Sequence, residues 1–76
     1  MIEELERVIL TVDIPEQSLQ TGDVGTVVLV HGDYIGYEVE FVALTGETLV
    51  MVSVYPHQIR RIERGELAHA RSMVAI

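Results

Sequence analysis

The chain has 76 residues, enough for one domain, and it contains no cysteine, which excludes disulfides and thiolate metal sites. Its formal net charge is −7 and it has no lysine, so most of its surface would repel a phosphate backbone. Hydrophobic residues make up 49% of the chain, a high share for so small a domain, and this favours assembly as a source of further burial.

Short apolar runs separated by turn residues predict strands and no long helix. In the long loop after the first run, Leu19 is expected to anchor the loop to the core. Gly22 and Gly25 are expected to form a tight bend with positive φ. Pro56 ends the fourth run and begins a single 3-10 turn. The five predicted strands cover residues 7–14, 26–31, 37–44, 48–55 and 60–62.

The third run alternates most regularly, with Glu38 and Glu40 facing solvent between apolar residues that face the core. The fourth run is apolar on both faces, since one face carries three valines and the other carries Leu49, Met51 and Tyr55. The second run, residues 26–31, is likewise apolar on both faces for most of its length. A small barrel has one interior, so one set must face outward and be covered by another subunit, a different protein or the chain's own tail.

Five short strands, a long first loop, two hairpins and a turn before the last strand are typical of a small SH3-like barrel. We therefore predict an all-β fold, with the barrel over residues 1–62. Residues 63–76 form a C-terminal tail. Leu67, Ala70 and Val74 share one helical face of that tail, which predicts a C-terminal helix, with a frayed terminus as the alternative.

No motif for catalysis or metal binding stands out. The three histidines lack the two-ligand spacing of metal sites. Glu38 and Glu40 are about 7 Å apart on one strand, but an exposed strand face offers no cleft to raise the pKa of either. We expect no enzyme activity, no cofactor and no metal. The one basic cluster, which includes Arg60 and Arg61, is expected to pair with acidic groups within the chain or across subunits.

Five segments carry a family resemblance: LERVILT at 5–11, DIPE at 13–16, GDVGTVV at 22–28, YEVEFV at 37–42 and QIR at 58–60. Together, over residues 4–62, they resemble a bacterial domain-of-unknown-function family of similarly short proteins. The resemblance implies an SH3-like fold and brings no activity or catalytic residue with it. Members are often encoded beside another small protein, which resembles the arrangement of an antitoxin and its partner.

The GDVGTVV segment is also similar to the KOW motif of ribosomal and transcription proteins. KOW domains are small barrels that typically bring basic residues to RNA or to a polymerase. The charge of −7 and the lack of lysine depart from that pattern. The physical requirement behind the motif is a glycine bend that enters an apolar strand.

The sequence thus predicts a non-enzymatic interaction module that self-associates, as a dimer, or binds a protein partner. A KOW-type nucleic-acid-associated barrel is the alternative. The acidic N-terminal residues lack the cationic start of a signal peptide, and no apolar run is long enough to span a membrane, so a cytoplasmic location is expected. The candidate partner-binding residues are Glu38, Glu40, Leu49, Met51, Tyr55, Arg60 and Arg61.

Overall fold

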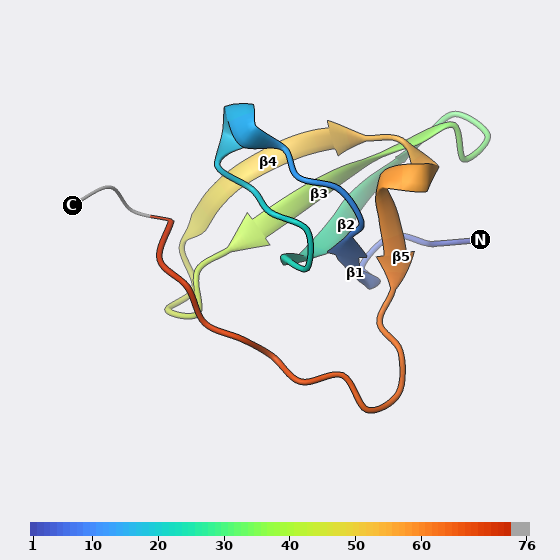
Figure 1. The fold of residues 1–76 in the computed structure, drawn as a ribbon. Coiled ribbons are helices and arrows are strands. Elements are labelled where there is room, and N and C mark those ends of the chain that lie inside the picture. The colour runs from blue at the N-terminus through green and yellow to red at the C-terminus, as the bar shows by residue number, and fades with distance from the viewer. Residues whose placement is uncertain (74–76) are drawn as a thin grey trace.

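Figure 1 shows the computed structural model, which describes residues 1–73. Every strand pair is antiparallel, in the order β4-β3-β2-β1-β5, which confirms the all-β prediction. No helix within residues 1–73 is long and apolar enough to cross a membrane. The elements are β1 (Arg7–Leu10), the 3-10 turn η1 (Pro15–Gln17), β2 (Val24–His31), β3 (Gly36–Val42), β4 (Thr48–Val54), the 3-10 turn η2 (Pro56–Gln58) and β5 (Ile59–Arg61).

The sheet is strongly curled, because its two edge strands are joined by one short connection. β4 and β5 lie at opposite ends of the strand order, yet only Tyr55 and η2 separate them. Neighbouring strands are about 4.8 Å apart, so four spacings in a flat sheet would hold these edges about 19 Å apart. A link that includes a tight 3-10 turn is too short for that distance. The curl is visible in Figure 1, although no strand pairing joins β4 to β5 within residues 1–73 and the sheet is not closed.

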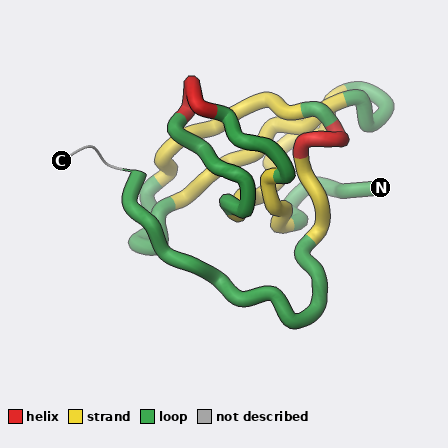
Figure 2. The backbone as a smooth tube through the Cα atoms, viewed as in Figure 1, coloured by secondary structure: helices red, strands yellow, loops and turns green. Residues whose placement is uncertain are grey.

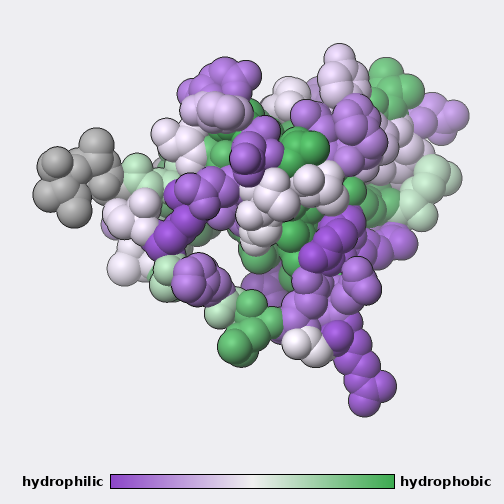
Figure 3. All heavy atoms as spheres, in the orientation of Figure 1, coloured by the Kyte–Doolittle hydropathy of each residue, from purple (hydrophilic) through white to green (hydrophobic). Residues whose placement is uncertain are grey.

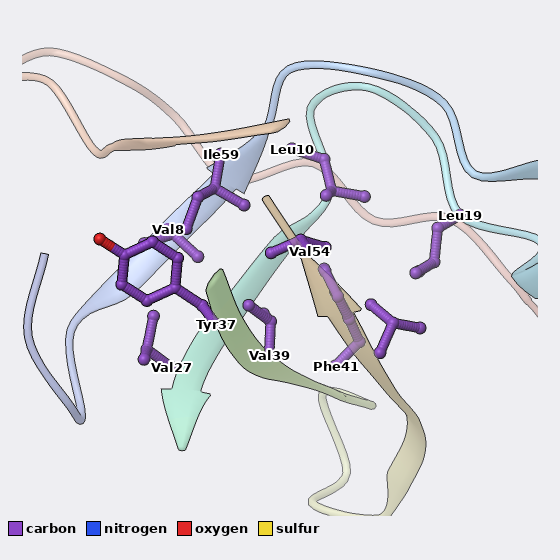
Figure 4. Packing of buried hydrophobic residues seen from close by; sticks show 10 residues of the cluster. Val8, Leu10, Leu19, Val27, Tyr37, Val39, Phe41, Val54 and Ile59 are labelled. Carbon is purple, nitrogen blue, oxygen red and sulfur yellow. The ribbon is translucent and has the colours of Figure 1, made fainter. Parts of the chain in front are cut away.

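The hydrophobic core lies inside this curl (Figure 4). All five strands contribute inward side chains, and the long first loop adds Leu19, which is only 2% exposed. Backbone hydrogen bonds between Ile14 and Leu19 in both directions, at 2.9 and 3.1 Å, hold the base of that loop. The predicted anchor is therefore confirmed. The buried cluster comprises Val8, Leu10, Leu19, Val27, Tyr37, Val39, Phe41, Val52, Val54 and Ile59.

The first strand is shorter than predicted, since it ends at Leu10 rather than at residue 14. Beyond Leu10 the chain turns into the first loop, where side chains compete for backbone groups. The Asp13 carboxylate accepts hydrogen bonds from the N–H of Thr21 at 2.8 Å and from its hydroxyl at 3.0 Å. These contacts close the loop across its base and leave no partner strand for residues 11–14.

Two β-bulges decide which side chains face outward. In β2, Val27 lies opposite Val39 and Leu29 lies opposite Glu38, so Val28 is an extra residue. Val27 consequently points into the core and Leu29 points out. In β4, Phe41 lies opposite Val50 while the next residue of β3 lies opposite Thr48, which makes Leu49 the extra residue. No turn residue marks either bulge in the sequence.

The predicted C-terminal helix is wrong over the described part of the tail, which runs as an extended loop in Figure 2, while Val74 lies outside the described residues. We call residues 62–73 the strap. Two ion pairs attach it to the rest of the domain, Glu66 with Arg60 and Arg71 with Asp23. A short isolated helix is marginal in water unless it buries an apolar face, and Leu67, on the predicted face, is 94% exposed.

Candidate interaction surface

The outer row of β4 is apolar and exposed. Leu49 is 40% exposed, Met51 51% and Tyr55 64%, whereas Val52 and Val54 are buried in the core. The predicted separation of the two faces is thus confirmed, with the valines inside. Ser53 lies between Met51 and Tyr55, so the outer row is not continuously apolar. The ring of Tyr55 stacks on that of His57 with centroids 5.9 Å apart.

Glu38 lies beside this row on β3 and is held by two neighbours. Its Oε2 is 2.7 Å from His31 Nε2 and also accepts a hydrogen bond from the Ser53 hydroxyl. The bond with His31, followed by that from Ser53, lowers the pKa of Glu38 below its usual value. The carboxylate therefore stays ionised at neutral pH and is tied to the surfaces of β2 and β4.

These three residues share the composition of a hydrolytic triad but not its order. In a serine hydrolase the histidine stands between the acid and the nucleophile, so that it can take the nucleophile's proton. Here the carboxylate of Glu38 stands in the middle, and both His31 and Ser53 contact the same oxygen. The arrangement positions side chains on the sheet surface and does not activate a nucleophile.

Glu40 lies one residue pair further along β3, opposite Met51 on β4 and Thr26 on β2. Its carboxylate accepts a hydrogen bond from the hydroxyl of Thr48. Leu29, 44% exposed, lies across from Glu38 on β2 and adds an apolar side chain to the same face. Sequence reasoning did not select Leu29, because its orientation depends on the bulge at Val28.

The remaining predicted residues, Arg60 and Arg61, lie on β5, at the opposite edge of the sheet from β4. Both guanidinium groups form internal ion pairs. Arg60 contacts Glu66 at 2.6 Å, and Arg61 contacts Glu6 at 2.9 Å. Hydrogen bonds from Arg60 and from a backbone N–H lower the pKa of Glu66 to about 2. The seven predicted residues therefore divide into one group on β3, β4 and Tyr55 and a separate pair on β5.

The internal ion pairs of Arg60 and Arg61 predict weak binding of nucleic acid. Because Glu66 and Glu6 neutralise Arg60 and Arg61 and the chain carries a net charge of −7, RNA should bind weakly even at low salt. Fluorescence anisotropy of a labelled single-stranded RNA at low ionic strength measures this directly. Tight, salt-sensitive binding that disappears in the Arg60→Glu, Arg61→Glu double variant would support the KOW-type alternative.

A second feature of the outer surface is a cavity of about 640 Å³ between the strap and the sheet. Its floor includes Ile9, Val24 and Val42, and its opening is visible in Figure 3. Ile9 is only 6% exposed although it is not part of the central core cluster. Leu49 also lines this cavity, so the strap and the outer row of β4 meet at that residue.

The far end of the strap is fixed by Arg71. Its guanidinium donates to Asp23 at 2.9 Å and to the carbonyl of Ser18 at 2.9 Å. Burial raises the pKa of Asp23, but the bonds from Arg71 and from the N–H of Gln20 outweigh it, and the pKa is lowered. The strap is thus attached by charge at the loop that enters β2. Within residues 1–73, no three histidine or acidic side chains come together to hold a metal ion.

Comparison with curated proteins and with solved structures gives no match. The model of one protein family, the domain of unknown function DUF4926, matches residues 4–61. The matched region runs from the segment before β1 to the end of β5 and leaves out the strap. Since the match covers most of the chain, the protein belongs to the DUF4926 family.

Proposed function

We propose that this protein is a non-enzymatic interaction module that forms a homodimer through the outer face of β3 and β4. One observation carries the proposal. β4 buries its inner row in the core, while Leu49 and Met51 of β4 and Tyr55, which follows it, are 40%, 51% and 64% exposed. Exposed apolar side chains grouped in this way on a small domain mark an interface more often than a solvated surface.

The surroundings of these residues fit the anatomy of an interface. Leu29 and Met51 supply apolar area, and Glu38 and Glu40 lie between them as a polar strip. Protein interfaces commonly mix apolar side chains with hydrogen-bonded polar ones. Two-fold association is the commonest way for a small chain to cover such a surface.

We also assign the domain to the SH3-like barrels and place it in the cytoplasm. The strand order, the long first loop and the 3-10 turn between the last two strands support the barrel assignment. The curl that brings β4 and β5 to one short connection is the geometry of a barrel left open at one seam. A partner protein encoded nearby, as in an antitoxin pair, would use the same outer face.

Changing Met51 to glutamate is expected to shift the dimer towards monomer, because a charge would be buried at the centre of the interface. Light scattering coupled to size exclusion at several concentrations measures the shift, and we expect at least a tenfold weakening of association. Leu67→Glu is the matched control, since Leu67 is 94% exposed on the strap. A wild-type protein that stays monomeric at high micromolar concentration would contradict the proposal.

A further inference from the structure

The free edge of β4 is unprotected beyond the bulge at Leu49, which lies near the start of the strand. Thr48–Val54 contains no charged residue and no proline. β4 pairs with β3 on one side, and no other segment of residues 1–73 forms a backbone hydrogen bond with it. Soluble proteins normally guard such edges with lysine, proline or a covering segment, because an open edge pairs with other strands.

The turn between β3 and β4 determines which backbone groups point to this edge. The N–H of Ala43 donates to the carbonyl of Glu47 at 2.8 Å. Closely and widely spaced hydrogen-bond pairs alternate along antiparallel strands. Continued through the bulge at Leu49, this alternation directs the N–H and C=O groups of Val50, Val52 and Val54 towards β3. The corresponding groups of Met51 and Ser53 then point to the free edge.

The open part of the edge is short and has a defined end. The N–H of Tyr55 is already bonded to the side-chain oxygen of Gln58 at 2.7 Å, so pairing cannot continue into η2. The backbone groups of Met51 and Ser53 form the centre of what remains. They lie two residues apart, which is the spacing of successive closely spaced pairs in an antiparallel ladder.

Resting on the homodimer proposed above, but placing its contact at the edge of β4 rather than on the outer face, we infer that two copies pair β4 to β4 as antiparallel strands, with the two-fold axis beside Val52. Met51 then lies opposite Ser53 of the second copy, and Ser53 lies opposite its Met51. Each pair exchanges N–H and C=O groups, as a closely spaced antiparallel pair requires. The two five-stranded sheets join into one continuous sheet, and the apolar outer rows of both copies become adjacent.

The free edge is self-complementary, which favours a second copy as the occupant. Met51 and Ser53 each direct an N–H and a C=O to the edge, so an antiparallel pair centred on Val52 gives all four of these groups in each copy a partner. Thr48–Val54 carries no charge, so two copies of a chain with a net charge of −7 can pair here without placing like charges opposite each other.

Amide hydrogen exchange followed by NMR tests the pairing on the unmodified chain. At low concentration, the amides of Met51 and Ser53 should exchange faster than those of Val50 and Val52, which bond to β3. At concentrations where light scattering shows dimer, exchange at Met51 and Ser53 should slow more than about tenfold. A dimer in which these two amides stay fast would overturn the edge pairing and leave dimerisation through the outer face standing. A chain that never dimerises would overturn both.

Two substitutions at one position separate the backbone from the side chain. Ser53→Pro removes an edge N–H that makes no bond to β3, a site where a strand can accept proline. Its dimer should dissociate with a Kd raised more than about tenfold. Ser53→Ala removes the hydroxyl and its bond to Glu38 but keeps the N–H, so its Kd should stay close to that of the wild type. Equal Kd values for two folded variants would overturn the inference, and the exchange experiment decides it if Ser53→Pro does not fold.

Discussion

Replacing Leu19 with alanine is expected to lower the free energy of unfolding by about 2–5 kcal/mol. Leu19 is 2% exposed and is the only residue of the first loop in the core cluster, so its loss leaves a cavity and releases the loop. A domain of this size has about 4–11 kcal/mol of stability in total, and the substitution would remove a large part of it. Urea unfolding followed by circular dichroism gives the difference.

The matched control is Leu44→Ala, which deletes the same atoms from a side chain that is 92% exposed in the turn between β3 and β4. Its effect should remain within about 0.5 kcal/mol. If Leu19→Ala were as mild as Leu44→Ala, the first loop would not depend on its anchor. Loss of the loop contacts in NMR spectra of Leu19→Ala, without a change in β3 and β4, would show that the loop does depend on Leu19.

Leu19 also illustrates what could be predicted from sequence. A single leucine between polar residues in a long loop has little reason to be there unless it reaches the core, and the structure buries it. The same reasoning succeeded for β3, where Glu38 and Glu40 alternate with buried residues, and for β4, where only one of two apolar rows fits inside. The buried and exposed faces of a regular strand can be predicted from the sequence, because successive side chains point to opposite faces of the sheet.

The bulges could not be predicted in this way. Each inserts one residue and reverses the alternation beyond it, so Val28 and Leu49 look in sequence like ordinary strand residues. Leu29 was missed for this reason. The strap was missed for another reason: its helical spacing is a local signal, while Arg71 is bonded to Asp23, which is far from it in the chain. Long-range ion pairs leave no periodic signal.

The residues of the predicted site came from two kinds of reasoning, and the structure places them in two groups. Leu49, Met51 and Tyr55 were selected by pattern, and the structure places them on one exposed row. Arg60 and Arg61 were selected by charge alone, and charge does not say where a strand lies in the sheet. Strand order puts β5 at the far edge, where its arginines meet Glu6 and Glu66.

Gly25 was expected to adopt positive φ together with Gly22, and this is wrong for Gly25. Gly22 has φ of +96°, but Gly25 lies within β2 and does not have a positive φ. A glycine is required at this position because there is no room for a larger side chain. A Cβ added at Gly25 would lie 2.6 Å from Val39 Cγ1 and 2.9 Å from Phe41 Cε1. The glycine is needed because β2 passes closely over the core side chains of β3.

Gly25→Ala should therefore cost about 3 kcal/mol, the upper part of the range for overpacking. Val39 is fully buried in the central part of the sheet and cannot move aside. Thermal unfolding should show a Tm lower by about 12–24 °C, since 1 kcal/mol corresponds to about 4–8 °C for a domain of this size. A Tm within a few degrees of the wild type would mean that β2 can shift away from β3.

A second substitution tests the cause. Val39→Ala removes Cγ1, the nearest atom to the added Cβ, although it destabilises the chain by itself. If the cost of Gly25→Ala is a clash, the double variant should be more stable than the sum of the two single effects predicts, by at least about 1 kcal/mol. If Gly25 were needed for its backbone conformation, the two effects would add, because removing a methyl group from Val39 does not relieve a strained dihedral angle. Favourable coupling would therefore establish that this glycine is required for the packing of β2 against β3.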